Sequence, residues 1–122
     1  VFRANPGRYS AGNPGIGTLA HLTTELFSLS LGTRIESVPY RGSGAALLDL
    51  STGRLALMID AMTSTLPQVQ GGRVRGLAVV QGTRSSLAPD LPAMPETGVP
   101  ELRDFQAQAW IAMFGPAGLP EK

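Results

Sequence analysis

The spacing of apolar and polar positions changes several times along the chain, and each change predicts a different element of secondary structure. After a glycine-rich stretch near the N-terminus, leucines recur at spacings of three and four, as Leu19, Leu22, Leu26 and Leu29. This spacing places the four side chains on one face of an α-helix, and a glycine commonly follows the end of a helix. We therefore predict an amphipathic helix that begins near Leu19 and ends near Gly32.

Five other segments have the patterns of β-strands: 8–11, 33–38, 54–60, 74–80 and 105–114. The segment 33–38 alternates and is rich in β-branched residues, and Pro39 ends it because proline cannot donate to a strand ladder. The segments 54–60 and 74–80 are nearly continuous apolar runs, which is typical of buried parallel strands. The aromatic residues of the last strand are expected in the core: Phe105, Trp110 and Phe114.

Short helices are predicted between these strands. Ser43 can cap a helix that stops before Gly53, a second short helix covers 63–72, and one helical turn falls near 94–98. Strands and helices thus alternate at the spacing of βαβ units. We predict a single α/β domain over residues 1–122, with a mostly parallel sheet flanked by helices on both faces.

The composition narrows the classes of partner. Charged residues make up only 16% of the chain, below the roughly 25% of an average domain. Either a missing domain or partner covers part of the surface, or the protein is simply thinly charged. The net charge is +1 and the cations are scattered, so nucleic acid is not an expected partner. The opening "VFRANPGRYS" contains neither an initiator Met nor a signal peptide, so we expect a mature fragment or an excised domain.

Other classes of site are also unexpected. The absence of cysteine excludes disulfides and thiolate metal sites, and no apolar run approaches the 18 residues of a membrane span. A hydrolase would need Ser10 or Ser43 near His21 and Asp60, but Ser43 lacks the context of a nucleophile elbow. We therefore expect no catalysis.

In a parallel sheet, ligands bind at the carboxyl ends of the strands, here the loops 12–18, 39–44, 60–65 and 81–84. The first loop partly matches two nucleotide-binding motifs. Gly12 and Gly17 are spaced as in a P-loop, but Thr18 stands where the lysine would be. Gly15 and Gly17 fit the dinucleotide fingerprint, with Glu36 about 20 residues later as a ribose-binding acid.

A helix that starts at Thr18 directs its unpaired amides and its dipole at this loop, which favours an anion. A triphosphate usually also needs a lysine and a Mg²⁺ ligand, whereas a carboxylate needs only oriented N–H groups and a hydroxyl. The loop therefore fits a carboxylate better. A dinucleotide and a turn that is merely tightly packed remain alternatives.

Four more side chains are candidates, each with an alternative. His21 and Glu25 have a metal-ligand spacing, but no second His or Cys completes a site, so His21 either supports the loop or contacts a ligand. Arg41 either pairs with a carboxylate or is only solvated, and Tyr40 either reaches the cleft or covers the core. Asp60 either accepts a hydrogen bond from a ligand or caps the following helix.

Five stretches together carry a family resemblance: "YSAGNPGIGTLAHL", "VPYRGSGAALLDLSTGRLALMID", "LPQVQGGRVRGLAVV", "RSSLAPDLPAMPETGVP" and "AWIAMFGPAGLP". In this order and at these intervals they resemble the TctC-type extracytoplasmic solute receptors of tripartite tricarboxylate transporters, the Bug (Bordetella uptake gene) family. The resemblance covers the chain from about Pro6 to Pro120 and matches only the second lobe of these two-lobed periplasmic proteins.

The resemblance implies that the chain captures a tricarboxylate, a dicarboxylate or an amino acid for the membrane components of a transporter. It implies no cofactor and no metal, and an isolated lobe could pair with a second copy. Arg41 stands where many members have lysine. A nucleotide-binding or dehydrogenase-like domain remains the alternative. The residues expected to bind the ligand are Asn13, Gly15, Ile16, Gly17, Thr18, His21, Tyr40, Arg41, Gly42 and Asp60.

Overall fold

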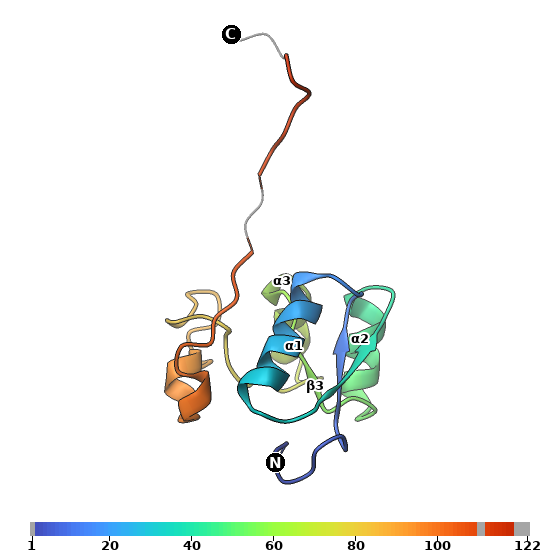
Figure 1. The fold of residues 1–122 in the computed structure, drawn as a ribbon, viewed down its shortest axis with the longest axis vertical. Helices are drawn as coiled ribbons and strands as arrows, with labels where there is room; N and C mark the ends of the chain where they lie inside the picture. The colour runs from blue at the N-terminus through green and yellow to red at the C-terminus, as the bar shows by residue number, and fades with distance from the viewer. Residues whose placement is uncertain (1, 110–111, 119–122) are drawn as a thin grey trace.

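The computed structural model describes residues 2–109 and 112–118. Its centre is a parallel sheet of three strands in the order β2-β1-β3, which confirms the predicted α/β class (Figure 1). The strands are β1 (Ser10–Asn13), β2 (Glu36–Pro39) and β3 (Leu57–Met58). Each is shorter than its predicted segment or shifted from it, and β2 ends at Pro39 as predicted.

Three helices connect or follow the strands: α1 (Leu19–Ser30), α2 (Ser43–Ser51) and α3 (Met62–Gln70). Helix α1 packs on β1 and β2, and α2 packs on β1 and β3. The connection from β1 to β2 and the connection from β2 to β3 run in opposite directions across the sheet, so the right-handed crossovers that parallel strands almost always have would put α1 and α2 on opposite faces. Two short 3₁₀ helices follow, η1 (Met94–Thr97) and η2 (Pro100–Leu102). None of the described helices is long and apolar enough to cross a membrane.

The ends of α1 and α2 follow local chemistry, with one correction. Thr18 caps α1 through its side chain, and Gly32 follows the helix with φ 59°. Helix α2 stops before Gly53, which has φ 78°. Ser43 does not cap α2. The N-cap is Gly42, whose φ of 98° favours glycine, and Ser43 is the first helical residue.

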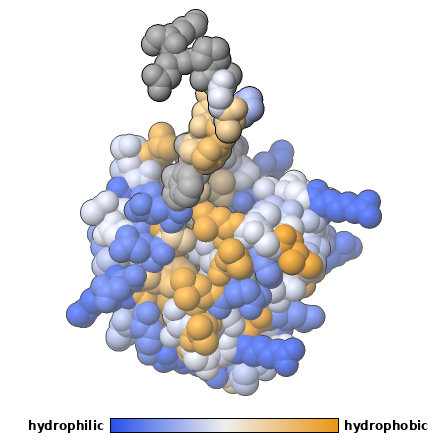
Figure 2. Space-filling model, turned by 45° about the horizontal axis from the view of Figure 1, so that its top comes forward, coloured by the Kyte–Doolittle hydropathy of each residue, from blue (hydrophilic) through white to orange (hydrophobic). Residues whose placement is uncertain are grey.

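The buried face of α1 is not its leucine face. Leu19, Leu22, Leu26 and Leu29 are 45% to 77% exposed, whereas Phe27 is buried. Thr23 and Thr24 are buried beside it, and their hydroxyls donate to carbonyls one turn back, at 2.7 and 2.8 Å. Because these bonds satisfy the hydroxyls, threonine can be buried against the sheet and the leucines remain outside. Figure 2 shows apolar residues gathered on part of the surface.

One apolar cluster joins α1 to the C-terminal part of the chain. Its buried members are Ala11, Phe27, Leu31, Ile35, Leu57, Met94, Leu102 and Phe105. Phe27 and Phe105 meet edge to face, with ring centroids 5.8 Å apart. Arg3 donates a hydrogen bond to the carbonyl of Leu31 and pairs with Glu101 on η2. The N-terminal segment is therefore bonded both to the end of α1 and to η2.

Two predicted strands are absent from the described residues. The segment 74–80 forms only an isolated bridge from Val79 to Ala93, and 105–109 and 112–114 form no strand. A strand exists only when a neighbour pairs with it. The far edge of β3 has no partner among the described strands, and residues of β3, α3 and 74–80 line a largely apolar cavity of about 550 Å³.

Ala107 still bonds to the carbonyl of Val80, and beyond it the described residues extend away from the body of the molecule (Figure 1). Phe105 is buried as expected, but Phe114 is 85% exposed, so the prediction that it lies in the core is wrong. Trp110 lies outside the described residues.

Candidate functional site

Two loops meet at the carboxyl ends of β1 and β2. The backbone N–H of Tyr40 donates to the carbonyl of Asn13 at 2.9 Å, and that of Gly42 donates to the carbonyl of Pro14 at 3.1 Å. These bonds continue the pairing of the two strands into their loops. The structure therefore brings the predicted loops 12–18 and 39–44 together, at the edge of the sheet where ligands bind in α/β folds.

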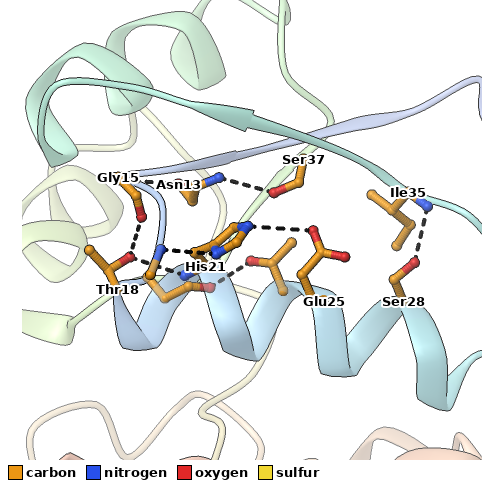
Figure 3. A network of polar contacts seen from close by, with 11 residues as sticks. Asn13, Gly15, Thr18, His21, Glu25, Ser28, Ile35 and Ser37 are labelled. Atoms are coloured by element: carbon orange, nitrogen blue, oxygen red, sulfur yellow. Dashed lines mark hydrogen bonds and ion pairs between the residues drawn. The ribbon is translucent and has the colours of Figure 1, made fainter.

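Asn13, the last residue of β1, lies beside Gly15 and holds the glycine-rich loop from the end of the strand (Figure 3). Its side chain is fully buried. The Oδ1 atom accepts the N–H of Gly15 at 3.0 Å, and Nδ2 donates to the Ser37 hydroxyl of β2 at 3.0 Å. Because both ends of the amide are used inside the protein, Asn13 positions the loop.

Thr18 and His21 hold the loop from the side of α1 (Figure 3). The Thr18 hydroxyl donates to the carbonyl of Gly15 at 2.7 Å and accepts the N–H of His21 at 3.2 Å. The Nδ1 atom of His21 accepts the N–H of Gly17 at 3.2 Å. His21 and Thr18 therefore both bond to the backbone of the loop, and the Thr18 hydroxyl is used by these bonds.

Three amides in this region have no hydrogen-bond partner among the described residues, those of Ile16, Leu19 and Ala20. The last two belong to the first turn of α1, where N–H groups point out of the helix and its dipole favours negative charge. Ile16 is 77% exposed and Leu19 45% exposed, so solvent reaches the region. The geometry suits a small anion.

The Tyr40 side chain turns towards α2. Its hydroxyl donates to Oδ2 of Asp49 at 2.8 Å, and Arg54 contacts Oδ1 of the same carboxylate at 3.2 Å. The hydrogen bond to Asp49, with some burial, raises the pKa of Tyr40 above its ordinary value. The Tyr40 hydroxyl is therefore bound to other residues of the protein. The part of Tyr40 that lies beside Gly15 is its backbone carbonyl.

Among the described residues of the two loops at this edge of the sheet, Arg41 is a cation without a partner. It is exposed and forms no hydrogen bond or ion pair with another described residue. Its neighbour Gly42 is bonded to Pro14, so Arg41 projects from a loop that is anchored to the glycine-rich loop. A guanidinium there can pair with a carboxylate in a bidentate manner.

Asp60 follows Met58, the register partner of Gly12, and so lies at the same edge of the sheet as the two loops, but it bonds to neither of them. It follows β3 and lines the apolar cavity, where its Oδ2 accepts the Ser64 hydroxyl at 3.1 Å. It does not cap α3, because the N-cap is Ala61 and has no side-chain bond. No hydrogen bond between described residues links Asp60 to either loop.

Gly12 has a packing role that the motif comparison did not predict. A Cβ at Gly12 would lie 2.5 Å from Leu55 Cδ1 and 3.5 Å from the Tyr40 ring. A larger residue at Gly12 would therefore have to displace the end of the Leu55 side chain, so glycine suits the place where β1 meets the side chains that cover it. Ser37 and Asp49, which hold Asn13 and Tyr40, were likewise not predicted, because their partners lie 24 and 9 residues away.

Glu36 is at the wrong end of β2 to bind a ribose beside the glycine-rich loop. Its register partner is Ser10, the first residue of β1, whereas the loop follows Asn13. Three residues of strand separate the two positions, or roughly 10 Å. Glu36 therefore matches the dinucleotide fingerprint in its distance along the sequence but not in its position in the fold. The described residues also contain no group of three or more His, Cys, Asp or Glu side chains that could hold a metal ion.

A family model described as the tripartite tricarboxylate transporter family receptor, TctC, matches residues 1–122. Among curated proteins, BugT of Bordetella pertussis is 39% identical over 120 residues, which make up 98% of this chain and 36% of BugT. The chain thus spans about a third of the length of BugT and of two further curated relatives.

Solved structures have the same fold. R. palustris Rpa4515, solved with adipate, has a TM-score of 0.80 at 36% identity, covering 87% of this chain and 34% of that protein. MatC from Rhodopseudomonas palustris, with bound malate, has a TM-score of 0.74 at 26% identity, covering 83% of this chain and 33% of that protein.

Proposed function

This chain belongs to the tripartite tricarboxylate transporter family of receptors, and we propose that it forms one lobe of a periplasmic receptor for a small carboxylate. It covers about a third of its relatives, so the remainder of the receptor would supply the other lobe. The receptor would deliver its solute to the membrane components of a transporter, and it would bind without catalysis.

The observation that carries this proposal is the group of unpartnered amides at Ile16, Leu19 and Ala20, at the N-terminus of α1. A carboxylate is small enough to be bound by two or three such N–H groups, and the helix dipole favours its charge. Two structural neighbours were solved with dicarboxylates, adipate and malate. A carboxylate is therefore the ligand class that both the chemistry and the relatives support.

The residues of the two loops would have different roles in binding the ligand. The free N–H groups of Ile16, Leu19 and Ala20 would bind one carboxylate, with Asn13 and His21 holding the loop in shape. Arg41 would pair with a second carboxylate of the same ligand, beside the backbone of Tyr40 and Gly42. Asp60 would meet a ligand amine or hydroxyl only if the ligand extends towards β3.

NMR chemical-shift titration of the ¹⁵N-labelled chain tests this proposal, because it detects weak binding. One lobe supplies only part of the contacts, so we expect dissociation constants on the order of millimolar. Adipate, malate, citrate and glutamate would be compared with NAD and ATP. Shifts confined to residues 15–20 and 40–42 on addition of a carboxylate support the proposal. Shifts with NAD or ATP alone, or carboxylate shifts elsewhere, overturn it.

A further inference from the structure

One contact of the glycine-rich loop depends on the protonation of a side chain. The N–H of Gly17 donates to Nδ1 of His21. A ring nitrogen can accept only when it carries no proton, so this bond requires the neutral imidazole with its hydrogen on Nε2. Gly17 has φ 80°, a conformation that glycine alone adopts easily, and the bond to His21 is the one described contact that orients its N–H.

Protonation strengthens a contact that the ring already has. The Nε2 atom lies 3.8 Å from Oε1 of Glu25, one turn further along α1. A protonated Nδ1 would point its hydrogen at the N–H of Gly17, so the imidazolium loses that contact while its attraction to Glu25 grows. The His21 side chain is 21% exposed, which leaves it room to turn.

Other charged groups near α1 do not compete for the ring. The elements packed on α1 are β1, β2 and η2. Strand β1 has no titratable side chain, Glu36 is exposed at the far end of β2, and Glu101 of η2 is paired with Arg3. Arg41, in the adjoining loop, keeps its charge at all relevant pH values.

We propose that His21 is a positioning residue whose neutral imidazole holds Gly17 in the carboxylate-binding loop, so that protonation releases the loop and weakens binding in acid. The inference rests on the proposed function for its effect on the ligand. The positive charge gained by the ring would itself attract a carboxylate, but Glu25 offsets that charge at short range and salt screens it further. The freed glycine must be ordered again when the ligand binds, which costs conformational entropy.

The structural half of the inference can be tested without any ligand. NMR spectra of the ¹⁵N-labelled chain between pH 5 and 8 would follow the Gly17 amide and both ring nitrogens of His21. We expect an unprotonated Nδ1 at high pH and a Gly17 resonance that moves with the same midpoint as the ring. The inference is overturned if the neutral ring carries its hydrogen on Nδ1. It is also overturned if the chemical shift of the Gly17 amide does not change when the ring is protonated.

Two variants separate positioning from simple packing. In His21→Asn the side-chain carbonyl lies near the place of Nδ1 and can accept the N–H of Gly17 at any pH, whereas His21→Leu cannot accept it. We expect the Gly17 amide to be independent of pH in both variants, and protected from hydrogen exchange only in His21→Asn. Equal protection in the two variants would show that the acceptor is irrelevant and would overturn the inference.

Adipate titrations then test the functional half. Comparison with His21→Asn at each pH cancels the titration of adipate itself. Between pH 7.5 and pH 5.5 we expect wild-type affinity to fall about fivefold relative to His21→Asn, the equivalent of one ordinary hydrogen bond. A wild type that binds relatively more tightly in acid refutes the inference. If adipate binds neither protein at pH 7.5 and no other carboxylate does, the proposed function fails, while the NMR titration still decides the link between Gly17 and His21.

Discussion

Leu19→Pro is expected to remove one ligand donor without harming the helix that carries it. Leu19 is the first residue of α1, the position at which proline is most favourable, because its missing N–H has no helical partner. Thr18, the residue before it, has φ −70° and ψ 158°, and this extended conformation is the one that a following proline requires. The backbone is therefore already suited to the substitution.

The magnitude follows from the bond that is lost. A hydrogen bond from an amide to a carboxylate contributes about 1.5–3 kcal/mol, so its removal should weaken binding by about 10- to 150-fold. The Leu19 side chain is 45% exposed, so its loss costs little packing, and Leu19→Ala, which keeps the amide, is the matched control. We expect the free energy of unfolding of the two variants to agree within about 1 kcal/mol.

The assay is a titration of adipate or malate into wild type, Leu19→Ala and Leu19→Pro, with thermal unfolding of each variant in parallel. The expected pattern is near wild-type affinity for Leu19→Ala and a large loss for Leu19→Pro at equal stability. A folded Leu19→Pro variant that binds as tightly as Leu19→Ala would refute the assignment of the anion to the N-terminus of α1.

Three further predictions concern the scaffold. Asn13→Ala leaves two groups without their partner and should lower the free energy of unfolding, measured by urea titration, by about 2–3 kcal/mol. Ser37→Ala removes only one of the two bonds and should cost about half of that. Equal losses in the two variants would contradict the two-bond role of Asn13. Hydrogen bonds from Arg84 and the Ala93 amide hold the pKa of Glu96 below its ordinary 4.5, so the contribution of this carboxylate to stability is present above that value and is lost as pH falls through the lowered pKa. Arg84→Gln should therefore raise the ¹³C NMR titration midpoint of Glu96, and an unchanged midpoint would exclude the pair in solution. The exposed leucine face of α1 could pair two copies of the chain, and Leu26, which is 45% exposed, lies on this face. If the face does so, Leu26→Lys should shift the sedimentation of the protein towards that of the 12.8 kDa monomer. A wild-type protein that is already monomeric would refute this pairing.

Local sequence signals predicted the elements whose formation depends on neighbouring residues. The period of the leucines located α1, and glycines located the ends of α1 and α2. The same period did not reveal which face of α1 is buried, because Thr23 and Thr24 satisfy their hydroxyls within the helix and can replace apolar residues there.

Features that depend on distant partners could not be read from the sequence. The apolar segment 74–80 has the composition of a strand, but no described strand pairs with it beyond one bridge. The sequence predicts an anion site at the glycine-rich loop, but the contacts of Asn13 and His21 within the loop depend on which atoms face one another. Glu36 has the expected sequence distance from the loop, and only the strand register shows that it lies at the opposite end.

Helix α3 contributes little to holding the molecule together, and this has a consequence for how the chain comes apart. It has nine residues and no buried side chain, and Pro67 interrupts its hydrogen bonding. A helix of this length is not stable alone, and the cavity beside it leaves few contacts that could compensate. Local unfolding should therefore begin between residues 62 and 72, well before global denaturation, with rapid amide exchange and early cleavage by proteases at that place. The half of the molecule built from β1, α1, β2 and α2, which carries both loops of the candidate site, would outlast it.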